Sequence, residues 1–212
     1  MQDYYAARAS EYDRIYLKTE RQSDLRKIEQ WLPDQLAGRS VLEIACGTGY
    51  WTQFFAPRAK RVVALDSAQE TLDIAQSRVP SDTVRFRIGD AYDIAAETPR
   101  FDAAFAGFWW SHIPLERIPE FLNGLHAALE PGATVIFLEN RYVAGSSTPL
   151  SGRDSEGNTY QTRRLDDGSE HRILKNFPSR DELFSAVAQV GNSPRFHEWE
   201  YYWALEYASA AR

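Results

Sequence analysis

The chain has 212 residues, a net charge of −6 and a pI near 5.3, which argue against a general nucleic-acid binder because such proteins carry basic surfaces. Its single cysteine excludes an intramolecular disulfide and a multi-cysteine metal site. No apolar run approaches the ~20 residues of a membrane span, and no signal-peptide pattern opens the chain. We therefore expect one cytoplasmic domain over 1–212, without a metal or a membrane anchor, with DNA excluded and RNA disfavoured as partners.

Strand-like and helix-like segments alternate through the first two-thirds of the chain. The first, 24–32, predicts a helix that ends at Pro33. Leu25, Ile28 and Leu32 form its apolar face. Strands are expected at 41–44, 61–65, 84–88, 101–105 and 134–138, and helices between them at 51–55, 71–78 and 115–129. This alternation is typical of βαβ units, so it predicts an α/β fold: a Rossmann-like, doubly wound, mostly parallel sheet with helices on both faces.

The remaining third of the chain breaks the alternation. Gly, Ser and polar residues without periodicity at 142–158 predict a mobile loop. Two strand-like runs, 160–165 and 170–175, flank Asp-Asp-Gly-Ser and predict a hairpin. A serine-capped helix over 179–190 and an aromatic, strand-like run over 195–207 follow. The expected parts of the domain are an N-terminal helical cap (1–33), a cofactor-binding core (41–140), a loop and hairpin insertion (142–178), and a C-terminal helix with strands (179–212).

The most informative segment is the run Val41-Leu-Glu-Ile-Ala-Cys-Gly-Thr-Gly49, which joins a strand to a small-residue loop and then to a helix. Small residues let a backbone approach a ligand, and the start of a helix offers unpaired N–H groups. Asp66 ends the next strand, where an acid can bind both hydroxyls of a ribose. Together these features predict a nucleoside-binding site.

The same segment departs from the Gly-x-Gly-x-x-Gly pattern of dinucleotide sites. Ala45 and Thr52 stand at the first and third glycine positions. Bulky Tyr50 and Trp51 stand where a pyrophosphate would approach. Glu43, inside the strand, suits a ligand with an ammonium group better than one with two phosphates. A nicotinamide-dependent oxidoreductase is therefore the least favoured alternative.

On these residues the chain resembles the class I S-adenosylmethionine-dependent methyltransferases, whose first motif reads roughly acid-x-Gly-x-Gly-x-Gly. Ile88-Gly-Asp-Ala91 resembles the third-strand motif of that family, 101–106 the fourth strand, and Leu129-Glu-Pro-Gly132 the turn before the fifth. The resemblance implies S-adenosyl-L-methionine as cofactor and S-adenosyl-L-homocysteine as product. It also implies a seven-stranded sheet whose last strand runs antiparallel beside the fifth.

The resemblance also implies roles for single residues. Glu43 would face the methionine end of the cofactor, Asp66 would hold the ribose, and Asp90 would meet the adenine amino group. Ala45 replaces the first glycine, which is a mild change if its φ angle is negative. The cofactor residues implied are Glu43, Ala45, Cys46, Gly47, Gly49, Asp66, Ser67, Asp90, Ala91, Ala106 and Tyr16.

The methyl acceptor is expected beside the end of the fourth strand. The segment 106–114 lacks the (Asp/Asn/Ser)-Pro-Pro-aromatic motif of nucleobase amino methyltransferases, and its aromatic run suggests an apolar wall for a small molecule or else ordinary core packing. His112 is the candidate general base, or alternatively a helix-cap or surface histidine. The hairpin cations Arg163, Arg164, Arg172 and Lys175 hold an anionic group or form a solvated face. The expected substrate residues are Tyr5, Tyr12, Phe108, Trp109, Trp110 and Arg141, with neighbouring Trp109 and Trp110 facing opposite ways.

These observations predict transfer of a methyl group to an O, N or S atom of a small organic metabolite by direct displacement. Two alternatives remain open. One is an RNA or protein methyltransferase with the same cofactor, and the other is a non-catalytic S-adenosylmethionine-binding subunit.

Overall fold

The computed structural model of the protein describes residues 9–94, 100–165 and 167–210. The strands of its central sheet are β1 (Ser40–Ile44), β2 (Arg61–Asp66), β3 (Val84–Ile88), β4 (Phe101–Gly107), β5 (Leu129–Asn140), β9 (Gly191–Glu198) and β10 (Tyr202–Ser209). They lie in the order β3-β2-β1-β4-β5-β10-β9. Strands β1 to β5 are parallel, and β10 is antiparallel to both of its neighbours. The expected sheet, with the last strand inserted beside the fifth, is confirmed.

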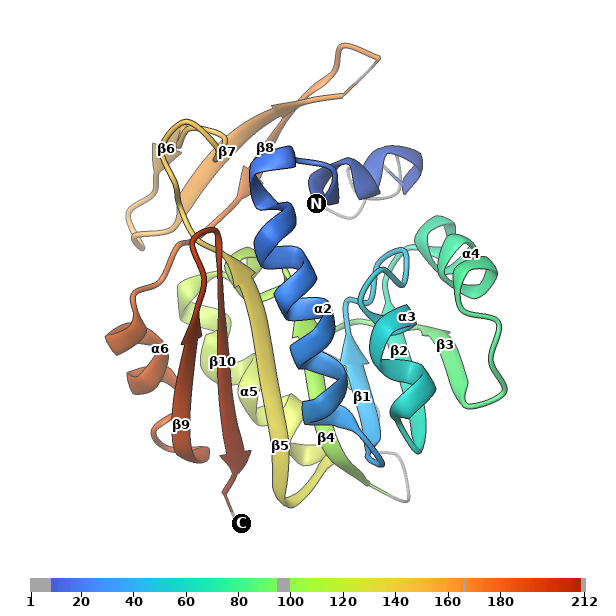
Figure 1. Ribbon diagram of the computed structural model, residues 1–212. Coiled ribbons are helices and arrows are strands. Elements are labelled where there is room, and N and C mark those ends of the chain that lie inside the picture. The colour runs from blue at the N-terminus through green and yellow to red at the C-terminus, as the bar shows by residue number, and fades with distance from the viewer. Residues whose placement is uncertain (1–8, 95–99, 166, 211–212) are drawn as a thin grey trace.

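Helices cover both faces of the central sheet (Figure 1). They are α2 (Gln22–Leu36), α3 (Thr52–Phe55) with the short η3 (Ala56–Arg58), α4 (Gln69–Arg78), α5 (Ile118–Ala127) preceded by η5 (Leu115–Arg117), and α6 (Arg180–Val187). Neighbouring residues of a strand point to opposite faces. Val41 accordingly packs in one core with the apolar residues of α2 and α3, and Leu42 in the other with those of α5 and α6.

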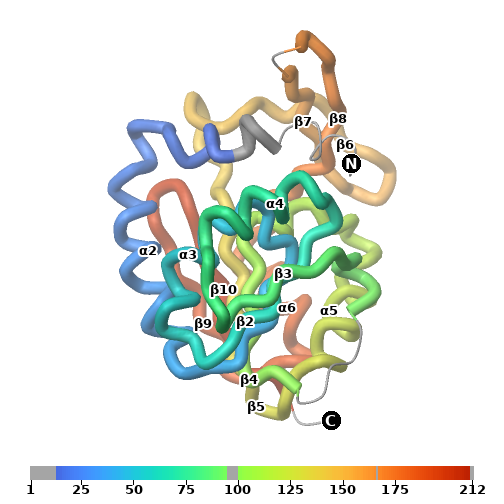
Figure 2. Tube along the Cα trace, turned by 90° about the vertical axis from the view of Figure 1, so that its right-hand side faces the viewer, coloured from blue at the N-terminus to red at the C-terminus, as the bar shows by residue number. Residues whose placement is uncertain are grey.

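Two further layers lie above the edge of the sheet at which the parallel strands end, as Figures 1 and 2 both show. One contains the 3-10 helices η1 (Ala9–Tyr16) and η2 (Thr19–Arg21). The other is a small antiparallel sheet of β6 (Gly152–Arg153), β7 (Thr159–Arg164) and β8 (Glu170–Leu174). The pairing of β7 with β8 confirms the predicted hairpin. A short 3-10 helix, η4 (Trp110–His112), follows β4 below these layers.

Several predicted boundaries were wrong. The fifth strand begins at Leu129 and not at 134, so the expected turn 129–132 lies within β5, and the helix expected over 179–190 ends at Val187. Helix α2 continues through Pro33 to Leu36, because the last turn buries Leu36 completely and this packing outweighs the lost hydrogen bond. The run 195–207 is two strands, since the chain turns at 199–201 with no glycine or proline to signal it. The segment 142–158 is not all loop, because it contains β6, which pairs with β7 beyond it. Within the described ranges, no helix is both long and apolar enough to span a membrane.

Candidate active site

A cavity of about 260 Å³ opens at the carboxyl ends of β1, β2, β3 and β4. Ligands of doubly wound sheets bind at this edge. The residues that line it are Ala45, Gly47, Asp66, Ser67, Thr71, Gly89, Asp90, Ala91, Tyr92, Phe108, Trp109, His112 and Arg117. The structure thus brings together most of the expected cofactor residues with the expected acceptor residues Phe108, Trp109 and His112.

Asp66 is fixed in the cavity wall by donors from the adjoining loops. Its Oδ2 accepts a hydrogen bond from the Gly47 amide at 2.8 Å, and its Oδ1 accepts from the Ala68 amide and the Thr71 hydroxyl, both at 3.0 Å. Burial raises the pKa of this carboxyl, and these hydrogen bonds oppose the rise. The carboxylate is therefore oriented before a ligand arrives. Thr71 belongs to no local motif, so sequence reasoning missed it.

The loop after β1 turns through positive φ angles, at Ala45 (53°), Gly47 (55°) and Gly49 (72°). The condition under which Ala45 would be a mild replacement is not met, because a side chain in the left-handed region costs about 1–2 kcal/mol. Gly49 does not line the cavity. A Cβ there would lie 3.1 Å from the Cβ of Ala75, so this glycine lets the loop pack against α4.

Glu43 lies behind the loop, almost fully buried, and does not reach the cavity lining. Its Oε2 accepts a hydrogen bond from the Thr52 hydroxyl at 2.7 Å. Burial raises the pKa of Glu43 to about 8, so the carboxyl is mainly protonated at neutral pH. Burial also raises the pKa of the neighbouring Cys46 thiol. A thiol in that state is a poor nucleophile, in keeping with its interpretation as a small loop residue.

The far end of the cavity carries a stacked pair that sequence reasoning missed. The Arg117 guanidinium lies 3.5 Å from the ring centre of Tyr92. Glu120 holds the guanidinium from the other side through two hydrogen bonds of 2.8 and 2.9 Å. Asp90 lies beside them, where its Oδ1 accepts from the Tyr92 amide at 2.9 Å. This end offers a carboxylate and flat surfaces, which suit a base with an exocyclic amino group.

Aromatic rings close the side of the site beneath the cap. Phe108, with a φ angle of 60°, stacks between Tyr16 and Tyr202 at centroid distances of 5.8 Å on each side. Tyr16 in turn stacks on Tyr50 at 3.4 Å. Tyr16 is therefore a wall of the aromatic cluster and not a residue of the cavity lining. Trp109 faces the cavity, whereas Trp110 packs on Phe137 in the core. Both tryptophans nevertheless border one core, Trp109 beside Phe121 and Trp110 beside Phe137, because β4 ends at Gly107 and η4 begins at Trp110, so the opposite facing expected from strand geometry does not apply.

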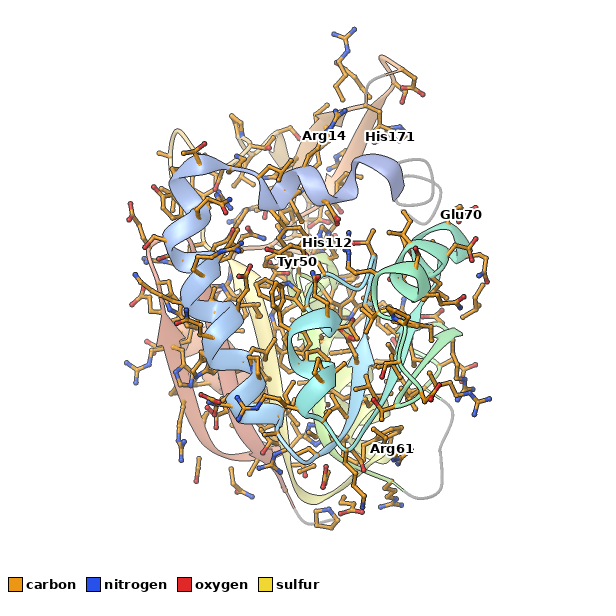
Figure 3. All side chains as sticks on the ribbon, turned by 45° about the vertical axis from the view of Figure 1, so that its right-hand side comes forward. Arg14, Tyr50, Arg61, Glu70, His112 and His171 are labelled. Atoms are coloured by element: carbon orange, nitrogen blue, oxygen red, sulfur yellow. The ribbon has the colours of Figure 1, made fainter. Side chains whose placement is uncertain are left out.

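His112 lies on η4 beneath the cap, where Figure 3 labels it. Its Nδ1 is 2.7 Å from the carbonyl oxygen of Leu174 in β8. Because a carbonyl only accepts, Nδ1 must donate, and a neutral ring then carries its lone pair on Nε2. The ring also lines the cavity while being only 5% exposed. This tautomer is the one required of a base that acts through Nε2.

The other expected residues lie elsewhere. Arg141 pairs with Glu198 at 3.0 Å and donates to the Trp199 carbonyl, so it lines a separate hollow by the β9–β10 turn. Ala106 is buried within β4. Tyr5 lies outside the described residues, and of Tyr12 only the backbone position within η1 is described.

The lining has the charge pattern of a site for a ligand rich in hydrogen-bond donors. It contains two carboxylates, Asp66 and Asp90, and its one strongly basic side chain, Arg117, is already paired with Glu120. Two carboxylates repel a pyrophosphate but accept from ribose hydroxyls, an adenine amino group or an ammonium. The buried indole N–H of Trp109 has no acceptor among the described residues, which suits a ligand with an additional acceptor. The fold and the site thus define an α/β protein that binds a non-phosphorylated nucleoside.

Comparisons with known proteins agree with this class. Residues 41–132 match the family model described as a methyltransferase domain. The structure of DhpI in complex with SAH is 31% identical, covers 100% of this chain and 96% of that one, and has a TM-score of 0.81. The corresponding DhpI–SAM–HEP complex is 32% identical and covers 97% and 94% of the two chains, with a TM-score of 0.80.

Curated relatives match over shorter stretches. The ubiquinone biosynthesis O-methyltransferase of Xanthomonas campestris is 31% identical over 153 residues, which are 70% of this chain and 60% of that protein. The malonyl-[acyl-carrier protein] O-methyltransferase of Serratia marcescens is 30% identical over 116 residues, which are 53% of this chain and 42% of that protein. The chain therefore spans well under two-thirds of these relatives.

The chain belongs to the class I S-adenosylmethionine-dependent methyltransferases, and S-adenosylmethionine is its cofactor. Asp66, Asp90 and two residues of the loop after β1, Ala45 and Gly47, line the cavity at the edge of the sheet where ligands of this fold bind. When bound, this cofactor supplies an electrophilic methyl group on a sulfonium. The protein groups that surround the cavity have then to position an acceptor atom.

Proposed function

We propose that this protein methylates an oxygen atom of a small acidic metabolite by direct displacement. The oxygen is favoured because the relatives from Xanthomonas campestris and Serratia marcescens are both named O-methyltransferases. Acidity is inferred from this chain's own side chains above the site. The observation that carries the proposal is the environment of Arg21.

Arg21 is a buried cation without a carboxylate partner among the described residues. Only 5% of the residue is exposed, yet its hydrogen bonds go to neutral oxygens: Asn140 Oδ1 at 2.8 Å, Ser146 Oγ at 3.0 Å and Ser147 Oγ at 3.5 Å. The guanidinium also lies 5.3 and 5.7 Å from the ring centres of Tyr201 and Tyr202, which offsets part of its charge. A buried cation without an ion-pair partner is still costly, and a bound anion would lower that cost. Asn140 ends β5, so Arg21 lies over the edge of the sheet at which acceptors bind.

Three more cations surround this position. Arg163 in β7 makes its side-chain bond to the neutral Gln161 at 3.0 Å. The pKa of Lys18 is lowered by burial and by the charges of Arg21 and Arg163, and the pKa of Lys175 by burial and the same two arginines. We call Lys18, Arg21, Arg163 and Lys175 the cationic cluster. Glu139 pairs with Lys175 and the charge of Glu20 acts on Lys18, whereas Arg21 and Arg163 have no carboxylate bonded to them among the described residues. An anionic group bound beside these two arginines would therefore be favoured.

The cluster adjoins His112 through Lys175, whose Nζ contacts Ser111 at 2.5 Å. An anion held by the cluster thus directs the rest of the molecule toward the segment that carries His112. Where the acceptor oxygen is a hydroxyl, Nε2 of His112 is the acceptor nitrogen for its proton. General-base assistance of this kind contributes about 10²–10⁴-fold.

The test is methyl transfer from labelled S-adenosylmethionine to a panel of small carboxylates, phosphates, phosphonates and sulfonates, each matched with a neutral amide or alcohol. We expect turnover of acids alone, and mass spectrometry of the product will distinguish an ester from an ether. Arg21→Met should raise the KM of the acid at least about tenfold, since a charge-assisted hydrogen bond contributes about 1.5–3 kcal/mol. Arg58→Met is the matched control, because Arg58 forms an exposed pair with Asp34. Preferential turnover of the neutral analogues would refute the proposal.

A further inference from the structure

The segment that carries His112 is held by the segment that follows β8. The Asn176 amide donates to the Ser111 carbonyl at 2.8 Å, and its side-chain Nδ2 donates to the Ile113 carbonyl at 3.1 Å. Between these two contacts lies the hydrogen bond from His112 Nδ1 to the Leu174 carbonyl. The orientation of the imidazole therefore depends on how 174–176 is placed relative to η4.

A buried ion pair fixes that placement. Lys175 Nζ lies 3.1 Å from Glu139 Oε2 and 2.5 Å from Ser111 Oγ, and the two charged side chains are only 5% and 1% exposed. The Ser111 amide and hydroxyl donate to Glu139 Oε1 at 3.1 and 2.5 Å, and the Asn140 amide donates to Oε2 at 2.9 Å. A carboxylate accepts about four hydrogen bonds. Glu139 is thus saturated, which makes it an anchor and not a base.

We propose that Lys175 is a positioning residue for His112: by bridging Ser111 and Glu139, it holds the imidazole in the Nδ1–H tautomer with its lone pair on Nε2. This inference rests on the proposed role of His112. Two hydrogen bonds join the two segments at adjacent residues. Ser111, which precedes His112, accepts from Lys175, and Leu174, which precedes Lys175, accepts from His112. We call this pair of contacts the junction.

The ion pair of Lys175 and Glu139 at the junction suits a role in orienting the imidazole. Well-packed apolar residues can replace a buried ion pair with little loss of stability or with a gain. Unlike apolar side chains, an ammonium and a carboxylate form hydrogen bonds in fixed directions, so the pair holds the two segments in one relative position. The junction also lies at the cationic cluster, since the charges of Arg21 and Arg163 act on Lys175. Lys175 would thus affect both the binding of the acidic acceptor and the orientation of the imidazole.

The first test needs no substrate. In two-bond ¹H–¹⁵N spectra of ¹⁵N-histidine-labelled protein, His112 is assigned by comparison with His112→Gln, which is practical with four histidines in the chain. We expect the Nδ1–H tautomer in the wild type and a mixture of both tautomers in Lys175→Met. Lys27→Met, which removes an exposed lysine paired with Asp24, should leave the spectrum unchanged. An unaltered His112 signal in Lys175→Met would overturn the proposal.

If Lys175→Met alone does not fold, the variant Glu139→Gln/Lys175→Met removes both charges together and leaves no unpaired ion in the core. Binding of S-adenosylhomocysteine and the circular dichroism spectrum establish that each variant is folded. The prediction for the double variant is the same mixture of tautomers. A single Nδ1–H tautomer in a folded double variant would refute the role of the pair.

Kinetics with the acidic acceptor that the panel identifies provide the second test. Lys175→Met should lower kcat by about 10- to 100-fold with the KM for S-adenosylmethionine unchanged, because displacing a catalytic group by 1 Å costs up to about 10²-fold. Lys175→Met should cause no additional loss of kcat in a His112→Gln background, since residues that act as a unit are not additive. Fully additive losses would refute positioning while leaving the role of His112 intact. If His112→Gln alone retained full kcat, the role of His112 would fail first.

Discussion

Replacing Glu43 by glutamine should stabilise the protein in alkaline buffer, because the wild-type carboxyl must then ionise in a site that excludes water. Burial raises its pKa from the ordinary 4.5 to about 8, and the carboxyl is paired with the Thr52 hydroxyl. Glutamine has the same shape and its amide oxygen can accept the same hydrogen bond. It has no proton to lose, so any pH-dependent difference between the two proteins reports on ionisation of Glu43.

The direction and size of this change in stability follow from the linkage between proton binding and folding. A group with a raised folded-state pKa contributes stability that is complete below its unfolded pKa and is lost as the pH rises through the folded value. For Glu43 the loss therefore begins near pH 4.5 and ends near pH 8. At about 1.4 kcal/mol for each tenfold change in proton affinity, the whole loss is on the order of 5 kcal/mol. Between pH 5.5 and 8, Glu43→Gln should gain about 3 kcal/mol on the wild type.

The assay is urea denaturation of both proteins at half-unit steps of pH without cofactor. Calorimetry with S-adenosylhomocysteine tests whether its ammonium comes close to Glu43, which lies behind the cavity lining. An ammonium there would favour the charged carboxylate, so binding to the wild type would release a proton below pH 8 and tighten with rising pH. The variant should show neither effect. Parallel stability curves would refute the assigned pKa. Equal proton release by both proteins would refute an ammonium beside Glu43.

Three other changes test the cap and the cavity. Arg78→Met removes the ion pair with Asp13 that fastens η1 to α4, and should weaken S-adenosylhomocysteine binding about tenfold in calorimetry; unaltered affinity would disprove a role for the cap in retention. Ala45→Gly relieves a positive φ angle and should raise the free energy of unfolding by about 0.5–1 kcal/mol, whereas a loss of stability would show that the angle carries no strain. Arg117→Ala uncovers Tyr92 and should raise the Kd of S-adenosylhomocysteine about 3- to 10-fold, with the Kd unchanged if the adenine does not lie there.

The parts of the site that could be predicted from the sequence are those set by short motifs. Asp66 ends β2 and Asp90 follows the end of β3 by two residues, and the topology alone carries both to one edge of the sheet. For such residues, position along the chain determines position in space. The facing of Trp109 and Trp110 was not predictable in this way, because β4 ends at Gly107 and both rings border the same core.

The rest depends on contacts between residues far apart in the chain. Ser111, Glu139 and Lys175 lie 28 and 36 residues apart in succession, and no periodicity relates them. Whether Glu43 reaches the cavity was likewise not decided by its motif, because the packing of Thr52 and the loop determines how far it is buried. The φ angle of Ala45 also depends on the path that the loop takes to reach α4.

Strand β10 lies between β5 and β9, although β9 comes before it along the chain. In the central sheet β9 pairs with β10, which in turn pairs with β5. Strand β9 can therefore join the sheet only after β10 or together with it. An isolated two-stranded hairpin is marginally stable in water. Until β10 pairs with β5, whether before β9 joins or together with it, the edge of β5 stays open to pairing with other chains. Addition of β10 and β9 thus moves the open edge of the sheet from the 12-residue strand β5 to the 8-residue strand β9.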